Sequence, residues 1–487
     1  MPETHPFWLA GKQATGEQTL EVTSPWDGAV VGRAWVPTAG QVEEAVAAAD
    51  GVRHDAQALP AYARAAALDH VSARIQERAE EIARLVTAEN GKPLKWARVE
   101  VSRAVSTFRW AAEEARRWGG ELQRLDTDPT AVGRVAVVRR FPRGPVLGIT
   151  PFNFPLNLVA HKVAPALAVG VPVVIKPAPA TPLTALLLGE LLAETDLPAG
   201  MFSVLPVPND RMAGLVEDPR LPVVSFTGSV PVGWQLKERV PRKHVVLELG
   251  GNAAVVVCAD WAGLDGADLD GADLDWAAQR IATFSNYQAG QSCIAVQRVY
   301  VDRRIADPLT ERVVGAVGVL RTGDPADERT DVGPMISEDA ARRVEAWVDE
   351  AVTGGARVLA GGVRRGAEYA PTVLADVPAG AKVLDEEVFG PVLVLAPFDS
   401  LDEAFAAVNA SRFGLQAGVF TRDVGTAFRA QRELEVGGVI VGDVPSYRAD
   451  QMPYGGTKDS GTGREGVHAA MVDLTEPRVL VLTGLPL

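Results

Sequence analysis

Apolar positions along the chain follow two different periods. From about residue 41 to residue 118 they recur every three or four positions with charged residues between them, which predicts amphipathic helices. From residue 145 onward, short β-branched runs alternate with helical stretches. The runs VPVVIKP, MFSVLP, LPVVSFTGS and KHVVLELGG predict buried strands, and LTALLLGELLAET and VGWQLKERV predict the helices between them. This alternation predicts a parallel sheet with crossover helices, and therefore an α/β fold.

A second alternation of the same kind runs from Asn252 to about Val441 and predicts a second α/β domain. Ahead of the first alternation, the stretch 134–149 (RVAVVRRFPRGPVLGI) alternates and is β-branched, which predicts a hairpin or an extended arm. The chain closes with the apolar run PRVLVLTGLPL, which we expect to pair with another sheet, for example in a second subunit. A length of 487 residues agrees with two or three domains.

Composition narrows the classes of function. A formal net charge of −14 argues against a nucleic-acid or anionic-membrane surface, and no run of about 18 apolar residues predicts a membrane span. The N-terminus shows no secretory signal, and only two cysteines occur, so we expect a reducing compartment, the cytoplasm. The repeat GADLDGADLD at 266–275 has no calcium-loop spacing, and we interpret it as a duplicated surface loop; no metal is expected.

The two cysteines occupy different settings. Cys258 lies inside the apolar run AAVVVCA and is typical of a small core residue. Cys293 follows the small-residue loop NYQAGQS, where a substrate could reach it. At an ordinary pKa of ~8.5 a thiol is mostly protonated at neutral pH, so a catalytic cysteine needs activation by its surroundings. Cys293 is the candidate nucleophile, although a tolerated loop cysteine would look the same locally.

Two further residues suit acyl chemistry. Glu248 ends the strand HVVLE before two glycines, at the edge where α/β sheets place ligands, and its leucine neighbours favour a raised pKa suited to a general base. Asn153 stands in PFNFP, where two prolines fix the loop and an amide could donate to an oxyanion. Taken alone, each could be an ordinary turn residue.

A turn after the strand LPVVSF suits a phosphate. Gly228 and Gly233 bracket it, Ser229 adds a hydroxyl, and a helix begins there, so free N–H groups could bind a pyrophosphate. Lys176 ends the strand VPVVIK, within reach of a ribose or phosphate oxygen. By contrast GTGREG at 461–466 matches the dinucleotide fingerprint but lacks a strand before it and room for a βαβ unit after it, so we reject it.

Several motifs in order resemble the aldehyde dehydrogenase superfamily over essentially the whole chain: ENGKP, PFNFP, IKPA, FTGS, LELGGN, GQSC, EEVFGPV and GGTKDSG. The resemblance implies that Cys293 attacks the aldehyde carbon and that Asn153, with the Cys293 backbone N–H, holds the oxyanion. It implies that Glu248 activates the water that hydrolyses the thioester. It implies NAD or NADP as cofactor, with Lys176 at the adenosine ribose, Ser229 and the 228–233 turn at the pyrophosphate, and Glu387 and Phe389 at the nicotinamide and its ribose. Further cofactor contacts are expected at Thr150, Pro151, Phe152 and Leu249.

The resemblance also implies a domain organisation, namely a Rossmann-type cofactor domain, an α/β catalytic domain and a small β arm for self-association as a homodimer or homotetramer. We assign 1–130 and 146–250 to the cofactor domain, 251–442 to the catalytic domain, 131–145 and 468–487 to the arm, and 443–467 to a return to the cofactor domain.

The sequence departs from the family pattern three residues after the lysine. Many NAD-preferring members have a glutamate there that binds the ribose hydroxyls, whereas this chain has Pro179. Loss of that carboxylate removes a partner of NAD and a charge that would repel a 2′-phosphate, so we expect NADP to be accepted.

The segment VPSYRADQMPYGG resembles members that oxidise small polar or anionic aldehydes, such as lactaldehyde, glyceraldehyde 3-phosphate, phosphonoacetaldehyde or sulfoacetaldehyde. Arg448 and Arg109 are the candidate substrate residues because guanidinium suits a carboxylate, phosphonate or sulfonate. Ser292 precedes the nucleophile, where several phosphate-specific relatives have arginine. Two alternatives remain: a CoA-acylating enzyme, which usually lacks the glutamate seen at Glu248, and a catalytically silent structural member.

Overall fold

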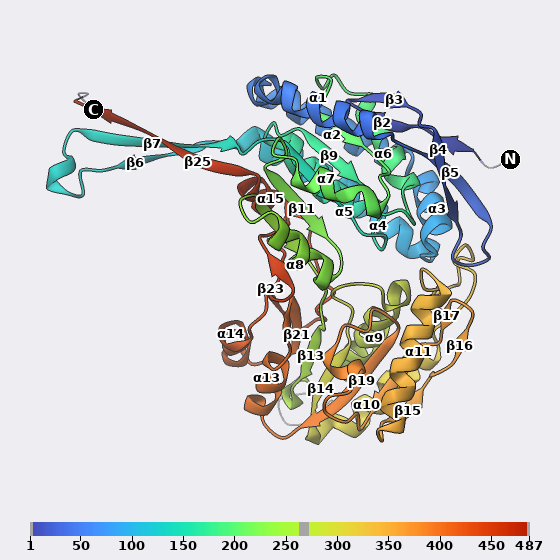
Figure 1. Ribbon diagram of the computed structural model, residues 1–487. Coiled ribbons are helices and arrows are strands. Elements are labelled where there is room, and N and C mark those ends of the chain that lie inside the picture. The colour runs from blue at the N-terminus through green and yellow to red at the C-terminus, as the bar shows by residue number, and fades with distance from the viewer. Residues whose placement is uncertain (1–2, 263–271, 485–487) are drawn as a thin grey trace.

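The chain forms two α/β bodies and a long projecting arm, seen in a computed structural model that describes residues 3–262 and 272–484 (Figure 1). Among the described residues, no helix is long and apolar enough to cross a membrane. Most of the GADLDGADLD repeat lies outside the described residues, and its last four residues open helix α9, Ala272–Asn286.

The region predicted to be helical, from about residue 41 to residue 118, consists of four helices. Thr38 and Gln41 form a reciprocal capping box at the start of the first, and Gly91, with φ of 76°, ends the third in a left-handed turn. Their apolar faces pack into the large core of the first body. The helices are α1 Ala39–Ala58, α2 Ala61–Glu77, α3 Ala79–Asn90 and α4 Leu94–Arg117.

An eight-stranded sheet, ordered β24-β12-β11-β8-β9-β10-β2-β3, forms the centre of the first body. Its five middle strands are parallel, and the chain runs outward from β8 first in one direction and then in the other. Such a reversal places a crevice at the carboxyl ends of the strands. The strands are β2 Phe7–Leu9, β3 Lys12–Ala14, β8 Val146–Ile149, β9 Val173–Lys176, β10 Phe202–Val204, β11 Val223–Thr227, β12 His244–Glu248 and β24 Gly461–Thr462; the helices are α5 Asn157–Ala168, α6 Leu183–Ala193, α7 Met212–Glu217, α8 Val230–Arg239 and α15 Val467–Asp473.

A seven-stranded sheet, ordered β15-β18-β19-β14-β13-β21-β22, forms the second body, as the second alternation predicts. All of its pairings are parallel except β15 with β18. The strands are β13 Ala254–Val257, β14 Arg298–Asp302, β15 Arg357–Ala360, β18 Thr372–Ala375, β19 Val392–Phe398, β21 Gln416–Phe420 and β22 Gly438–Val441; besides α9, the helices are α10 Ala306–Gly318, α11 Glu338–Thr353, α12 Lys382–Asp385, α13 Leu401–Asn409 and α14 Val424–Glu433.

The arm is a three-stranded antiparallel sheet that projects from the first body (Figure 1). It begins earlier than the expected residue 131, because a strand over 120–124 pairs with the middle strand. The stretch 134–149 is not one hairpin, since the first half lies in the arm and the second half is β8. The C-terminal run pairs with its own chain and leaves an outer edge. The arm strands are β6 Gly120–Arg124, β7 Arg134–Pro142 and β25 Thr475–Thr483.

Small sheets complete the fold. One joins three N-terminal strands, and a two-stranded pairing of β20 with β23 leads into β24, which pairs with β12. The chain therefore returns from the second body to the first within the range 443–467. These strands are β1 Thr4–His5, β4 Gln18–Thr23, β5 Val30–Val36, β16 Arg364–Arg365, β17 Glu368–Tyr369, β20 Phe413–Gly414 and β23 Thr457–Lys458.

Candidate active site

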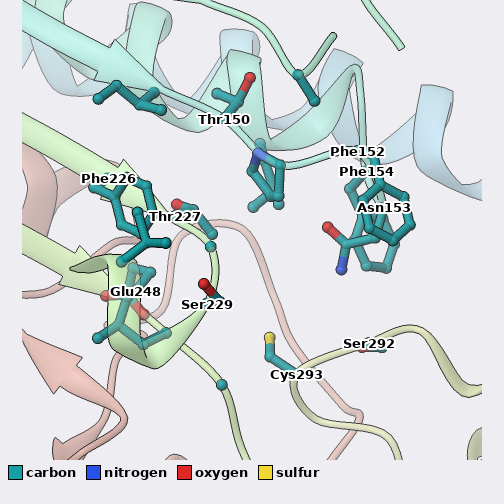
Figure 2. A pocket seen from close by; sticks show the side chains of 18 of the residues that line it. Thr150, Phe152, Asn153, Phe154, Phe226, Thr227, Ser229, Glu248, Ser292 and Cys293 are labelled. Atoms are coloured by element: carbon teal, nitrogen blue, oxygen red, sulfur yellow. The ribbon is translucent and has the colours of Figure 1, made fainter. Parts of the chain in front are cut away.

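A cavity of about 790 Å³ opens at the carboxyl edge of the first sheet and reaches the Cys293 loop of the second body (Figure 2). The strand ends lie side by side there because the last residues of neighbouring parallel strands pair with each other, Ile149 with Lys176 and Thr227 with Glu248. The cavity brings together most of the side chains singled out from the sequence. They are Thr150, Pro151, Phe152, Asn153, Lys176, Pro179, Gly228, Ser229, Glu248, Leu249, Ser292, Cys293, Glu387, Phe389 and Arg448.

The loop before Cys293 has a strained backbone. Gln288 and Ala289 adopt left-handed conformations with φ of 55° and 52°, which non-glycine residues seldom do. At Gly290 a Cβ atom would lie 2.1 Å from the carbonyl oxygen of Gly390, so only glycine fits. The tight turn presents Cys293 to the cavity, and Figure 2 shows its sulfur facing inward. Burial raises the pKa of this thiol to about 12.

Glu248 ends β12 and is 3% exposed. Neither carboxyl oxygen has a hydrogen-bond partner among the described residues, and its side chain faces the cavity (Figure 2). Burial raises its pKa well above the ordinary value, and the nearby Glu465 adds to the rise. A Cβ atom on Gly455 would lie 2.8 Å from its Oε1. The glutamate is therefore a desolvated carboxyl whose two buried oxygens have no hydrogen-bond partner among the described residues.

Asn153 lies across the cavity from Glu248 (Figure 2). Its side-chain amide donates to the backbone oxygen of Gln291, 3.0 Å away, in the loop that carries the thiol. The side chain of Gln288 in turn donates to the backbone oxygen of Asn153. These two contacts fix the amide relative to Cys293.

Lys176 and Pro179 also line the cavity. The ammonium donates to the side-chain oxygen of Asn209, and burial lowers its pKa to about 8. Ser229 is the residue before the first turn of α8, where the helix offers free N–H groups. Gly233 does not line the cavity. A Cβ there would lie 2.4 Å from Leu249, so this glycine permits α8 to pack on Leu249.

Glu387 lines the cavity and accepts a hydrogen bond from the backbone N–H of Gly251, at 2.9 Å. Burial raises its pKa to about 7. A Cβ on Gly250 would lie 2.3 Å from its carboxylate, and a Cβ on Gly251 would lie 2.1 Å from the backbone oxygen of Cys293, which explains the two glycines. The ring of Phe389 meets that of Phe152 edge-on, with centroids 6.0 Å apart.

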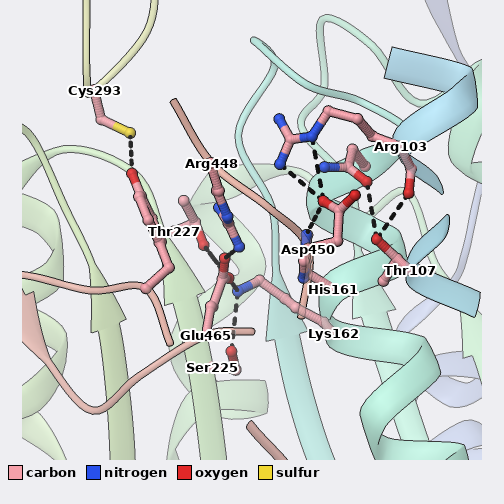
Figure 3. Close-up of polar contacts among 12 residues, drawn as sticks. Arg103, Thr107, His161, Lys162, Ser225, Thr227, Cys293, Arg448, Asp450 and Glu465 are labelled. Atoms are coloured by element: carbon pink, nitrogen blue, oxygen red, sulfur yellow. Dashed lines mark hydrogen bonds and ion pairs between the residues drawn. The ribbon is translucent and has the colours of Figure 1, made fainter. Parts of the chain in front are cut away.

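Arg448 lies within a buried group of charges that the sequence did not reveal (Figure 3). Its guanidinium donates to Glu465 at 3.1 Å and covers the ring of Tyr454 at 3.8 Å, while its Nε–H has no partner among the described residues. Lys162 also contacts Glu465, at 3.3 Å. Burial favours the neutral form of Glu465, but Lys162 and Arg448 outweigh it and lower its pKa to about 2.

The expectation for Arg109 is corrected, because its side chain is exposed, stacks beside Trp110 and does not line the cavity. Arg103 on the same helix lines it instead and donates to Asp450 at 2.9 Å. Arg109 lies six positions after Arg103, which is roughly 240° around a helix, so the two side chains point to different sides. Asp450 also contacts His161, whose pKa burial lowers to about 4.

Ser292 is buried beside the nucleophile. Its hydroxyl accepts a hydrogen bond from the phenol of Tyr287, at 2.7 Å.

The segment 461–466, rejected as a phosphate loop, has another structural role. A Cβ on Gly461 would lie 1.9 Å from the backbone oxygen of Leu247, so this glycine permits β24 to pair with β12.

A doubly wound sheet with a cavity at its switch point, facing a half-buried cysteine, defines an NAD(P)-dependent oxidoreductase. The model of the aldehyde dehydrogenase family matches residues 10–480, and the chain belongs to this family. It is 41% identical to the 3-sulfolactaldehyde dehydrogenase of Priestia aryabhattai, over 98% of this chain and 97% of that protein. It is 37% identical to the succinate-semialdehyde dehydrogenase [NADP(+)] GabD of Escherichia coli, over 98% and 96%. The crystal structure of aldehyde dehydrogenase 21 from Physcomitrella patens with the reaction product succinate superposes with a TM-score of 0.96 at 45% identity, covering 100% and 99% of the two chains.

Proposed function

We propose that the enzyme oxidises a small anionic aldehyde to its carboxylic acid through a thioester on Cys293. The sulfur bonds to the aldehyde carbon, and the oxyanion accepts hydrogen bonds from the Asn153 amide and the Cys293 backbone N–H. Loss of a hydride from that carbon, to NAD(P)+ when it is bound, leaves a thioester. Water then adds to the thioester, Glu248 takes a proton from the water, and the Cys293 thiolate leaves and regains a proton as the acid is released. The observation that carries this proposal is the convergence of Cys293, Glu248 and Asn153 on one cavity.

The residues of the cavity fit a dinucleotide. Lys176 would bind the adenosine ribose, Gly228 and Ser229 at the start of α8 the pyrophosphate, and Glu387 and Phe389 the nicotinamide end. The buried Glu387 supports this assignment, because a carboxylate in such a place favours a hydrogen-bond donor such as a ribose hydroxyl. We place Thr150, Pro151, Phe152 and Leu249 along the same path. When bound, NAD(P)+ supplies the acceptor for the hydride that leaves the aldehyde carbon.

Water rather than CoA is proposed to release the product. Glu248 is buried with two unpartnered oxygens beside the cavity, which suits a base that takes a proton from water. An enzyme that transfers the acyl group to CoA does not need such a base. Formation of NAD(P)H with and without CoA tests the proposal, because a requirement for CoA would favour the acylating alternative. A catalytically silent protein would form no NAD(P)H in either case.

An anionic substrate is proposed from the charges around the thiol. Arg103 and Arg448 line the cavity, and Lys162 pairs with Glu465 beside Arg448. The carboxylates of Glu465 and Asp450, whose pKa values are lowered, balance part of this positive charge, while burial raises the pKa of Glu248 and favours its neutral form. The unpartnered Nε–H of Arg448 could donate to a carboxylate or sulfonate. The names of the relatives, sulfolactaldehyde and succinate semialdehyde dehydrogenase, agree with such a substrate.

Replacement of Arg103 by alanine is expected to lower kcat/KM for 3-sulfolactaldehyde or succinate semialdehyde by about tenfold to a hundredfold, the value of one charged hydrogen bond. Propanal, which is neutral, should lose less than about threefold. Steady-state kinetics of both aldehyde types would measure this difference. Arg109→Ala is the matched control, since Arg109 lies on the same helix outside the cavity. Equal losses for charged and neutral aldehydes would remove the anion site from the proposal.

Pro179 is proposed to permit NADP. No carboxylate occupies this position, so we expect the enzyme to accept NADP. Any preference for NAD in kcat/KM should be smaller than about a hundredfold. Pro179→Glu should lower kcat/KM for NADP by about tenfold, because its charge would repel the 2′-phosphate. Pro179→Gln controls for the change of backbone and size. The proposal is wrong if the glutamate and glutamine variants discriminate against NADP equally.

We propose the domain roles expected from the sequence, with the arm starting at β6. We propose self-association as a homodimer or homotetramer through the arm, because its outer strand β25 exposes Val479, Leu480 and Val481 by 62%, 58% and 49%. Sedimentation of a monomer at micromolar concentration would contradict this proposal.

We also propose a cytoplasmic location, since both cysteines are free, as in a reducing compartment. Recovery of the protein in a membrane or secreted fraction would contradict this location.

A further inference from the structure

The hydroxyl of Tyr454 lies 3.0 Å from the sulfur of Cys293, and this contact is the dashed line at the thiol in Figure 3. The thiol packs in an apolar cluster with Ile294, Leu415 and Tyr454. Such surroundings disfavour the thiolate, which is the reactive form of a cysteine. An enzyme that uses Cys293 as its nucleophile therefore needs a partner that stabilises the sulfur anion within this cluster.

Only one of the two atoms can donate once the cysteine ionises. Burial raises the pKa of Tyr454 well above its ordinary value, so the phenol retains its proton. A thiol could donate to or accept from the phenol, but a thiolate can only accept. A hydrogen bond to an ionised acceptor is stronger than one between neutral groups. The contact consequently stabilises the thiolate more than the thiol.

The phenol is held in place by a closed set of contacts. The backbone N–H of Tyr454 donates to the oxygen of Glu465 at 2.9 Å, and the reverse bond is 2.7 Å. The Glu465 carboxylate accepts from Arg448, whose guanidinium lies 3.8 Å from the Tyr454 ring. Backbone, ion pair and ring stacking thus fix the position of the hydroxyl before any substrate enters.

Other charged groups act on Cys293 without touching its sulfur. Glu387 and Glu248 raise the pKa of the thiol, and Arg448 lowers it from behind the tyrosine ring. Among the described groups that perturb the thiol, Tyr454 is the one that hydrogen-bonds to it. Its hydroxyl is therefore the group best placed to offset burial directly.

We propose that Tyr454 is a catalytic residue that donates a hydrogen bond to the Cys293 thiolate, with Arg448 and Glu465 as positioning residues. This inference rests on Cys293 being the nucleophile of the proposed function, and it names the group that stabilises the attacking anion. The sulfur loses its charge when it bonds to the aldehyde carbon, so the hydrogen bond acts chiefly before that step. Its loss should consequently lower kcat/KM at neutral pH and be reversed as the pH rises.

Tyr454→Phe tests this inference because it removes the hydroxyl and retains the ring. Tyr287→Phe is the matched control, since that phenol bonds to Ser292, one residue from the nucleophile. The rate of alkylation of Cys293 by iodoacetamide is measured against pH on the full chain without substrate. Mass spectrometry of the Cys293 peptide separates it from the buried Cys258. Melting temperatures check that both variants fold.

The Tyr454→Phe variant is expected to shift the alkylation midpoint upward by about one pKa unit and to slow alkylation at neutral pH about tenfold. Tyr287→Phe should change the rate by less than about twofold. In Tyr454→Phe, kcat/KM should recover at high pH, which a purely structural defect would not produce.

An unchanged midpoint in Tyr454→Phe, or an equal shift in Tyr287→Phe, overturns the inference while leaving Cys293 as the nucleophile. A Tyr454→Phe protein that does not fold overturns it as well, because the residue would then serve stability. The readout needs no aldehyde, so an error in the substrate class does not affect it. A wild-type Cys293 that resists alkylation throughout the pH range contradicts the inference together with the proposed function.

Discussion

Replacement of Cys293 by serine is expected to lower kcat by at least about a thousandfold. A serine hydroxyl has nearly the same size, but it ionises far less readily than a thiol and is a weaker nucleophile in the same apolar cluster. Steady-state formation of NAD(P)H measures the loss. Binding of the cofactor, followed by calorimetry, should be unchanged within about twofold, because the contacts proposed for it lie elsewhere in the cavity.

Cys258 provides the control for this replacement. It is buried among apolar residues of the second body and lies outside the cavity. Cys258→Ala should retain most of the activity, with a loss confined to stability. Activity above about a tenth of wild type in Cys293→Ser would show that another group carries the substrate.

Replacement of Glu248 by glutamine is expected to arrest the reaction after one turnover. The amide has the shape of the carboxyl but cannot take a proton from water, so the thioester should form and persist. Rapid mixing should show a burst of about one NAD(P)H per active site, followed by a steady state slower by about a hundredfold or more. A slow reaction without a burst would instead assign Glu248 to the formation of the thioester.

The pH dependence of the wild type follows from the same residue. Burial and the charge of Glu465 raise the pKa of Glu248, so its base form is scarce at low pH. Hydrolysis should therefore increase as the pH rises through that pKa and level off above it. The glutamine variant should lose this rise, because it has no carboxyl group to ionise. A rise that survives in Glu248→Gln would mean that another group limits hydrolysis.

Local sequence signals predicted the central strands of both sheets, whereas Cys293, Glu248 and Asn153 were assigned together through the ordered family motifs. The β-branched runs form β9, β11 and β12, and Gly250 is needed because a Cβ there would collide with Glu387. The two-residue β1 and the exposed β6 carry little apolar pattern, and β5, although its sequence VVGRAWV is largely apolar, was not among the predicted strands. Their pairing depends on distant partners that periodicity does not reveal.

The charges around the thiol illustrate what the sequence could not provide. Arg103 and Arg109 look alike along α4, and only the rotation of the packed helix decides which one faces the cavity. Tyr454 stands in a motif used for the family resemblance, yet its bond to Cys293 joins residues 161 positions apart. Glu465 belongs to a segment that we rejected as a phosphate loop, and its neighbours Lys162 and Arg448 come from separate parts of the chain.

The most direct test of the central claim is mass spectrometry of the Glu248→Gln protein, quenched after reaction with an anionic aldehyde and NAD(P)+. The account predicts that the peptide containing Cys293 gains the mass of the aldehyde less two hydrogens, as a thioester requires, with one NAD(P)H formed per modified chain. Formation of NAD(P)H while Cys293 stays unmodified would contradict the account.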